Sequence, residues 1–366
     1  MSKQIEIFRN NALKQFKETP LQDRKHGLGI KTRLDWVELK DFGKGDLSLQ
    51  KGHAKILSQK EFLSSDNSLI QEARESLFKY EGKKEKIDYL HYAKSNIYAI
   101  HITESSDDPI IINQVLNENS LNHVFVIVEK NVNADVLIST FGENITGTSY
   151  TQILCGEGAK ISISIVKDMK NSYLHCKNQV LLKKDTTSHL VTADFGSKLI
   201  VNESTATLVE SASDSRIDTL FFGLDEEEFD ISSSSIHANK NTKSLLNSKG
   251  ALQGSKVINR GLVQINSNAP DSNGYQKSDI LLLDEKAHAV SIPDLLIHND
   301  QVACSHGSTI SNLEEEKVFY LQSRGLSKQQ AEKKLVEGFF FPILEDIRNE
   351  EITEFIHEKI MERINR

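Results

Sequence analysis

The sequence predicts a mainly β protein with helices at both ends, and three observations lead to this fold class. Between about residue 100 and residue 310, short β-branched segments end at Gly, Asn or Ser, as strands and their turns do. A short motif recurs ahead of several of these segments. No helical pattern longer than two turns interrupts the region, which argues against a doubly wound α/β sheet.

The strand pattern is clearest in four segments, at residues 124–128, 134–138, 159–165 and 197–201. Aliphatic residues of the region alternate with Ser, Thr, Lys and Asp, as expected when one strand face is buried and the other is wet. The recurring motif is a turn residue, a small residue, a variable residue and an aliphatic residue, with copies at 133–136, 158–161 and 196–199 and a partial copy at 250–252. A spacing of roughly 20 to 40 residues is typical of repeat architectures. These patterns leave two architectures open, a β-sandwich and a β-solenoid.

The two ends of the chain show helical periodicity. Near the N-terminus, apolar residues at positions 5, 8, 12 and 16 predict one helix, and residues 67–78 predict another. We therefore expect three domains, which are an N-terminal mixed or helical region over residues 1–100, a β core over 101–310 and a C-terminal helical domain over 311–366.

The expected C-terminal domain has clear start and stop signals. Asn312 with Glu315 predicts a capping box for a helix that ends at Gly325, and residues 327–330 predict a second capping box. Pro342 predicts a break or a new first turn. The second helix is expected to carry one apolar stripe, formed by Ala331, Leu335, Gly338 and Phe339. A last amphipathic helix carries Ile352, Phe355, Ile356, Ile360 and Ile364.

The composition restricts the partners and the compartment. The 366 residues carry a net charge of -8, which argues against a nucleic-acid backbone as the main partner. The three cysteines, at positions 155, 176 and 304, are too few and too scattered for a disulfide framework and favour a reducing compartment. No apolar run approaches the roughly 20 residues that span a bilayer, and no signal or import peptide is evident. We expect a cytoplasmic protein whose partners include neither a nucleic acid nor a membrane.

The usual signatures of enzymes are missing from the sequence. It contains no phosphate-binding loop, no Gly-x-Ser-x-Gly elbow, no His-Glu-x-x-His zinc motif and no dinucleotide fingerprint. Cys-x-x-Cys is also absent, which excludes a self-contained cysteine cage for a cluster. The sequence therefore predicts a non-catalytic protein that supplies a surface and a few ligands.

Residues 302–307 contain the best candidates for metal chemistry. Cys304 and His306 are two positions apart, so on a strand their side chains emerge on one face. A thiolate beside an imidazole can hold a thiophilic metal or an iron–sulfur fragment, although two ligands are too few for a closed site. In the alternative reading, Cys304 is a small buried hydrophobe and His306 is structural or exposed. We expect the acidic run at 225–228 and also His237 to lie in solvated turns.

The sequence around this pair resembles the SufB/SufD family, the scaffold subunits of a sulfur-mobilisation system that assembles iron–sulfur clusters. The resemblance rests on Ser291-Ile292-Pro293, on residues 319–326 (Phe-Tyr-Leu-Gln-Ser-Arg-Gly-Leu) and on Gly338-Phe339. It covers the C-terminal third of the chain clearly and the strands before it in outline. The family's core is a right-handed parallel β-helix, so the resemblance implies the solenoid rather than the sandwich.

Two positions make the chain resemble SufD more than SufB. Lys277 stands where SufB-type chains place a functional cysteine. The run Cys304-Ser305-His306-Gly307 matches the SufD form, whereas SufB-type chains carry His-Glu there. Cys155 and Cys176 match nothing in the family and are expected to be packing residues.

The resemblance also implies partners and a mechanism. A SufD-like chain pairs with a SufB-like chain through their β-helices, and the C-terminal helices of each dock a SufC-like ABC ATPase. Closure of the ATPases on nucleotide would shift the interface and expose Cys304 and His306, so that iron or a transient iron–sulfur cluster is shared with the partner subunit. The docking candidates are Phe319, Tyr320, Arg324, Gly325, Ala331, Leu335, Gly338 and Phe339.

Three alternatives to this interpretation stay open. The chain could pair with itself as a homodimer, although Lys277 counts against that variant. It could be a structural β-solenoid adaptor without metal chemistry, in which Cys304 is a packing residue. It could also be a carbohydrate-active β-helix enzyme, but such a site needs carboxylates grouped on consecutive rungs, and no acidic pair recurs at that spacing.

Overall fold

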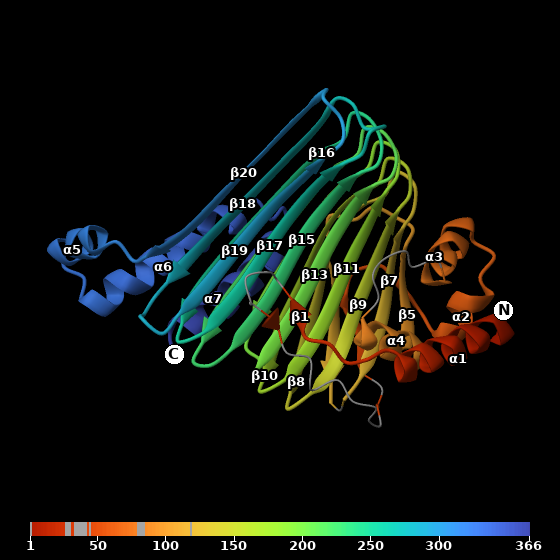
Figure 1. The fold of residues 1–366 in the computed structure, drawn as a ribbon, viewed down its shortest axis with the longest axis horizontal. Helices are drawn as coiled ribbons and strands as arrows, with labels where there is room; N and C mark the ends of the chain where they lie inside the picture. Colours follow the sequence, from red (N-terminus) through yellow and green to blue (C-terminus); the bar gives the residue numbers. More distant parts are fainter. Residues whose placement is uncertain (1, 26–30, 33–41, 44, 79–84, 118) are drawn as a thin grey trace.

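The computed structural model shows an elongated body of two long sheets with helices at both ends (Figure 1). It describes residues 2–25, 31–32, 42–43, 45–78, 85–117 and 119–366. Within these residues each of the two long sheets has nine strands. The mainly β solenoid expected from the sequence and its resemblance is confirmed, whereas the exact domain limits stay a prediction.

Successive strands alternate between two sheets, which we name sheet I and sheet II. Sheet I contains, in spatial order, β20 (Val302–Asn312), β18 (Ser272–Leu282), β16 (Lys243–Gln253), β14 (Asp214–Leu224), β12 (Thr187–Phe195), β10 (Lys160–Lys170), β8 (Asn133–Glu143), β6 (Ile110–Leu116) and β3 (Asp46–Lys51). Sheet II contains β19 (His288–Ile297), β17 (Lys256–Ile265), β15 (Glu228–His237), β13 (Leu199–Leu208), β11 (Tyr173–Leu182), β9 (Thr146–Cys155), β7 (Leu121–Val128), β5 (Asn96–Ile102) and β4 (Lys55–Leu57). Neighbours within a sheet are parallel, except that β3 and β4 pair antiparallel with β6 and β5. The chain therefore stacks turn upon turn, as a parallel solenoid does.

One backbone conformation marks the turn that follows six strands of sheet II, from β7 to β17. The residue at that place has a positive φ of 55° to 70° in six successive turns, at Asn131, Gly158, Asp185, Ala212, Asn241 and Asp271. The spacing between these positions is 27 to 30 residues, which is the length of one turn of the solenoid. The N–H of each donates to a carbonyl of the following turn, as from Asn131 to Glu157. Gly, Asn and Asp tolerate this left-handed conformation best, which explains most of the residues found there.

The motif that the sequence suggested does not mark equivalent positions, and this part of the prediction was wrong. Lys160 pairs with Asn133, so the structural equivalent of Gly158 is Asn131 and not Asn133. The third copy follows a strand of sheet I, and residues 250–252 lie inside β16. The physical reason is that the turns repeat a backbone conformation that several residue types can adopt. The amino acids at these positions therefore vary, whereas the conformation is retained.

The space between the two sheets is filled mainly by aliphatic side chains. One continuous cluster of buried Val, Ile, Leu and Ala runs between the sheets from Ile100 to Ala269. Hydrogen-bonded polar groups also lie between the sheets. Buried Lys167 donates to Asp194 at 2.8 Å, and Asn202 donates to the other oxygen of the same carboxylate at 2.6 Å. This pairing offsets the free-energy cost of burying the charge of Lys167.

The N-terminal segment covers the outer face of sheet II. It forms α1 (Ser2–Glu18), β1 (Arg24–Lys25), β2 (Lys31–Thr32), α2 (Gln59–Ser64), α3 (Ser68–Phe78) and α4 (Lys86–Lys94). Helices α2, α3 and α4 pack on strands β5, β7 and β9. Phe62 of α2 stacks on Phe125 of β7 with ring centroids 4.7 Å apart. The two helices predicted here from periodicity are confirmed.

Three helices follow the last strand, and they correct two details of the sequence prediction. They are α5 (Glu315–Ser323), α6 (Lys328–Leu344) and α7 (Glu350–Ile364), of which α7 packs on β12 and β14 of sheet I. The capping box of Ser327 and Gln330 is confirmed. The one predicted at Asn312 was wrong, because that residue ends β20 and Glu314 precedes the helix without a side-chain cap. Pro342 does not break the helix but lies inside α6.

The buried face of α6 also differs from the predicted stripe. Val336 and Phe340 are buried with Ala331, and they pack in the cluster formed with α7 and sheet I. Gly338 lies on the exposed side, and a Cβ added there would meet nothing within 4 Å. The helix buries aliphatic and aromatic residues one position away from the predicted ones because the contact with sheet I selects its orientation. This contact also holds the helix together through Pro342.

A pair of buried histidines lies between the N-terminal helices and sheet II. Nε2 of His91 in α4 and Nδ1 of His123 in β7 are 3.0 Å apart. Burial lowers the pKa of His123 to about 4. Burial, helped by the neighbouring His123, lowers the pKa of His91 well below its usual value. Both side chains are therefore neutral at pH 7 in the folded protein.

We expect the folded protein to lose stability as the pH falls from 6.5 towards 4. In that window the unfolded chain binds protons at His91 and His123 that the folded chain does not bind. The contribution of His123 should be about 3 kcal/mol once the pH is below 4. Urea unfolding at a series of pH values checks this, with His123→Gln expected to flatten the dependence. An equal pH dependence in the variant would contradict it.

Candidate functional site

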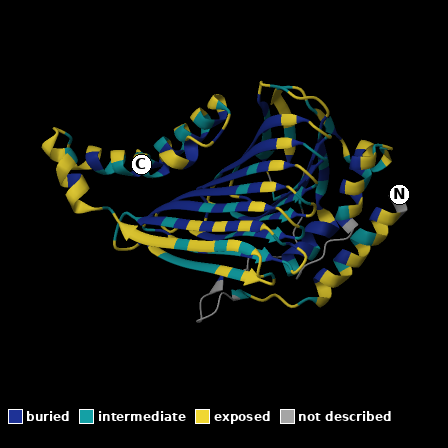
Figure 2. Ribbon diagram, turned by 90° about the horizontal axis from the view of Figure 1, so that it is seen from above, coloured by how far each residue is buried: buried dark blue, intermediate teal, exposed yellow. Residues whose placement is uncertain are grey.

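The solenoid ends in two strands whose outer edges are unpaired. In the described part of the chain, β20 pairs with β18 alone and β19 with β17 alone. Figure 2 shows this end of the body in yellow and teal, against the dark blue of the buried strands behind it. Three apolar side chains of these strands, Leu296, Ile297 and Ile310, are 41% to 44% exposed. An exposed edge of this kind is a template for pairing with another chain.

Both predicted ligands, Cys304 and His306, lie on β20 at this open end. The two side chains share one face of the strand because strand residues alternate. Cys304 is half-buried and packs on the apolar core between the sheets, whereas His306 is exposed. Burial raises the pKa of the Cys304 thiol, so the group is a thiol until a metal or a base takes its proton. The structure thus places the pair at an edge open to a partner, and its role as an iron ligand stays a prediction.

Polar side chains lie behind this pair. His306 faces Gln276 in the strand ladder, and the Gln276 side-chain oxygen is buried without a hydrogen-bond partner. Below it, Ser278 accepts from Asn259 at 2.8 Å and from Ser291 at 3.3 Å. Ser308 of β20 in turn donates to Ser291 at 2.8 Å. Hydrogen-bonding side chains therefore lie beside the apolar core where the solenoid opens.

Lys277, which the family resemblance aligns with the SufB cysteine, lies on the outer side of β18. Its ammonium contacts Asp279 at 2.8 Å, and the hydrogen bond to that carboxylate raises the pKa of Lys277. Lys249 of β16 contacts Asp279 at 3.4 Å and lies over the ring of Phe339 in α6, 4.3 Å from its centroid. This cluster of side chains connects the last strands of sheet I to the C-terminal helices.

The remaining residues considered from the sequence divide into confirmed and corrected predictions. Cys155 and Cys176 are buried packing residues, as expected, and burial raises the pKa of each thiol to about 12. His237 was expected in a solvated turn, but it ends β15 and is buried. Glu227 was expected in a solvated run, but its carboxylate pairs with buried Arg363 of α7. The acidic run at 225–228 did not predict that Glu227 pairs with an arginine far away in the sequence.

The docking candidates lie along α5 and α6. Phe319 and Tyr320 project into solvent with 72% and 56% of their surface exposed, and Arg324 lies over the Tyr320 ring at 5.3 Å. Gly325 ends the first helix with a φ of 98°, as predicted. The other candidates differ in exposure, since Ala331 is buried, Leu335 and Phe339 are half-buried and Gly338 is exposed.

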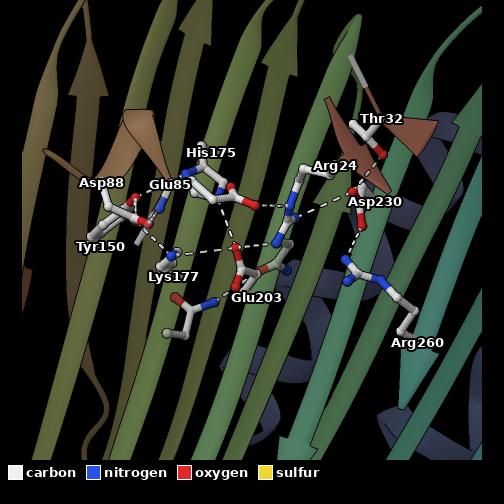
Figure 3. A network of polar contacts seen from close by, with 12 residues as sticks. Arg24, Thr32, Glu85, Asp88, Tyr150, His175, Lys177, Glu203, Asp230 and Arg260 are labelled. Carbon is white, nitrogen blue, oxygen red and sulfur yellow. Dashed lines mark hydrogen bonds and ion pairs between the residues drawn. The ribbon is translucent and has the colours of Figure 1, made fainter. Parts of the chain in front are cut away.

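A second polar cluster, which no sequence pattern indicated, lies on the outer face of sheet II (Figure 3). Glu85, His175 and Glu203 bring potential metal-ligand atoms within 4.8 Å of one another. Arg24 of β1 occupies the same place, however, and donates to Glu85 at 3.0 Å and to Glu203 at 2.8 Å. Burial alone would lower the pKa of Arg24, but the carboxylates of Glu203, Asp230 and Glu85 together raise it. An arginine cation therefore fills the position that a metal ion would need.

The hydrogen bonds of His175 also argue against a metal in this cluster. Tyr150 gives its single proton to Asp88 at 2.6 Å, so it accepts from His175 Nδ1 at 3.0 Å. His175 Nε2 is 3.0 Å from Glu203, whose carboxylate can only accept. Both ring nitrogens are therefore engaged in hydrogen bonds within the cluster, and neither is left to bind an ion. The cluster, which we name the N-terminal lock, fastens the segment around Arg24 and the start of α4 to sheet II.

Comparison with known proteins agrees with the resemblance seen in the sequence. Residues 110–339 match the family model described as SUF system FeS cluster assembly, SufBD core domain. This match covers more than half of the chain and contains Cys304 and His306. The chain belongs to the SufBD family.

Two curated relatives in this family come from staphylococci. The iron–sulfur cluster assembly SufBD family protein of Staphylococcus haemolyticus strain JCSC1435 is 28% identical to this chain over 268 residues. The corresponding protein of Staphylococcus aureus strain USA300 is 26% identical to it over 268 residues. Each match covers 63% of this chain and 57% of the relative, so the chain spans little more than half of the length of these SufBD proteins.

Among the described residues, no helix is both long enough and apolar enough to cross a membrane.

We expect Arg24→Ala to loosen the N-terminal lock strongly. The change removes the buried guanidinium that pairs with Glu85 and Glu203, and breaking a buried pair costs about 3–5 kcal/mol. Urea unfolding measures this loss. The control is Lys130→Ala, which removes an exposed pair with Glu157 and should cost less than about 1 kcal/mol. Equal small losses in both variants would contradict the lock.

Proposed function

We propose that this SufBD family protein is the SufD-like subunit of the system, a non-catalytic scaffold in iron–sulfur cluster assembly. In this proposal it pairs with a SufB-like chain and docks a SufC-like ABC ATPase, which hydrolyses ATP. Iron enters, and the nascent cluster forms, at the interface between the two SufBD chains near Cys304 and His306. The single observation that carries the proposal is that these two residues lie on the unpaired last strand, directly before the exposed aromatic helices.

The unpaired strands support pairing with a second β-helix. Strands β19 and β20 leave backbone N–H and C=O groups free on their outer edges, and such groups are satisfied when another strand aligns with them. A SufB-like chain with a similar last turn would provide that strand. Cys304 and His306 would then be at the junction, where the partner could supply the ligands that the pair lacks. A second copy of this chain could pair in the same way, and Lys277 favours the heterodimer.

The exposed aromatic residues support docking of the ATPase at the C-terminal helices. Phe319 and Tyr320 of α5 and Phe341 of α6 are among the most exposed large apolar side chains of the described residues, and exposed apolar surface marks sites of interaction. Beside them a cleft of about 520 Å³ runs between α5, α6 and the ends of the last strands, lined by Leu283, Leu313, Val318 and Gln322 among others. Aromatic side chains around a groove are typical of binding hot spots.

The connection between the helices and the candidate ligands is short. Only residues 313 and 314 separate β20 from α5. Helices α6 and α7 pack on sheet I, so they provide a firm support against which α5 can move. A pull on α5 by a closing ATPase would therefore act directly on the strand of Cys304 and His306.

Affinity purification of the full chain from its native cytosol tests the proposed partners. We expect an ABC-type ATPase and a related β-helix chain in the eluate, and Phe319→Asp should reduce the ATPase at least tenfold because it places a charge in the apolar contact. The control is Ile7→Asp, which changes an exposed apolar residue of α1 at the other end of the molecule. If neither partner is recovered, the structural adaptor becomes the better proposal.

The double variant Cys304→Ser with His306→Gln tests the ligand role. In the reconstituted complex we expect cluster formation, followed by the visible absorbance of the cluster, to fall at least tenfold while both partners still bind. The control is Cys155→Ser with His189→Gln, two residues remote from the open end. Unchanged cluster formation in the first variant would refute the role of the pair.

A further inference from the structure

His237 is a buried imidazole that the fold brings against Cys304. Across the ladder of sheet I, Cys304 of β20 faces Gly274 of β18, which faces Ser244 of β16. A Cβ on Gly274 would lie 3.5 Å from the Cys304 sulfur and 3.5 Å from His237 Nε2. The sulfur and the nitrogen therefore border one space and are at most 7.0 Å apart. Residue 274 is a glycine and places no side chain of its own between them, and Cγ1 of Val263 lies 2.5 Å from the same point.

Hydrogen bonds determine which nitrogen of His237 carries the proton. Thr242 donates its hydroxyl proton to the carbonyl of Asn239 at 3.0 Å, so it accepts from His237 Nδ1 at 2.7 Å. Ser244 Oγ lies 2.8 Å from Nε2 and donates to it. The nitrogen that borders the space shared with Cys304 is thus the one with the lone pair. A hydroxyl that fixes the far nitrogen is the arrangement that orients metal-binding histidines.

We propose that His237 is a further donor of the Cys304 site, so that Cys304, His237 and His306 bind a divalent cation of the iron and zinc class. The inference rests on the proposed function in taking Cys304 and His306 as ligands, and it adds a third donor from inside the solenoid. Thiolate and imidazole are the donors that such ions prefer. Binding releases the Cys304 thiol proton to water. These three donors leave a coordination position that water or a partner residue would fill.

The surroundings of the site fit this assignment. Cys304 lies on the last strand, so its side chain can turn towards His237 without displacing a further turn of the solenoid. A side chain at Gly274 would meet Val263 at 2.5 Å and occupy the shared space. Ser244, which now donates to Nε2, has Ser235 as a second partner at 2.9 Å and can keep that bond when a cation takes its place.

Titration of the full chain with Co²⁺ without oxygen tests the proposal, followed by the near-ultraviolet charge-transfer band of a cobalt thiolate. Cys304→Ser should abolish the band, and His237→Gln should weaken binding at least tenfold. The control is His189→Gln, which removes a histidine that bonds Asp218 on the same sheet away from the open end. If His237→Gln binds Co²⁺ as tightly as this control, or if the unaltered chain shows no band, the proposal is wrong.

A measurement on the unaltered protein keeps the test valid if His237→Gln does not fold. Cobalt X-ray absorption of the loaded chain should show one sulfur and two imidazoles around the ion, and His306→Gln should retain one imidazole. No imidazole in His306→Gln would exclude His237 as a donor. This result does not depend on the ATPase or on the partner chain, so failure here and failure of the proposed function can be told apart.

Discussion

Backbone hydrogen bonds between successive turns hold this molecule together. Such a stack of strands has a first and a last turn, and each of them has an edge without a neighbouring turn. At its start, antiparallel β3 and β4 close the two sheets, and the N-terminal helices cover sheet II. At its other end, β19 and β20 present free edges. Exposed strand edges are a liability unless something pairs with them. The two ends of the solenoid are thus chemically different, and the residues of functional interest lie at the open one.

This asymmetry brings three features to one place. The half-buried thiol of Cys304 lies on the last strand, hydrogen-bonding side chains lie beside the apolar core behind it, and α5 follows that strand after two residues. A chain that pairs with β20 and a protein that binds α5 would therefore act on the same strand from two sides. The N-terminal lock, centred on Arg24 and Glu203, fastens the segment around Arg24 to the middle strands of sheet II. This arrangement fits the proposed scaffold role, in which the open edge receives a partner chain.

Local patterns in the sequence correctly predicted the types of the elements, the helices at both ends and the capping box at Ser327. They failed where the structure depends on contacts between distant residues. Arg24 and Asp230 are 206 positions apart, and Asp225 to Glu228 gave no hint of Arg363. His237 looked like a turn residue because it ends its strand, although the solenoid closes over it. The solenoid itself needed the family resemblance, since its repeat is a backbone angle at Asn131, Gly158 and their equivalents rather than a side-chain motif.

Hydrogen exchange of the backbone amides in β19 and β20 tests the central claim, that the open edge is the interface with a second chain. In the isolated protein, the outward amides of these strands should exchange orders of magnitude faster than those of the interior strands β12 and β14, whose amides are paired on both sides. With a SufB-like chain bound, the same amides should become protected while the rest of the solenoid stays unchanged. If a bound partner leaves the exchange of β19 and β20 as it was in the isolated chain, the edge is not the interface and the account is wrong.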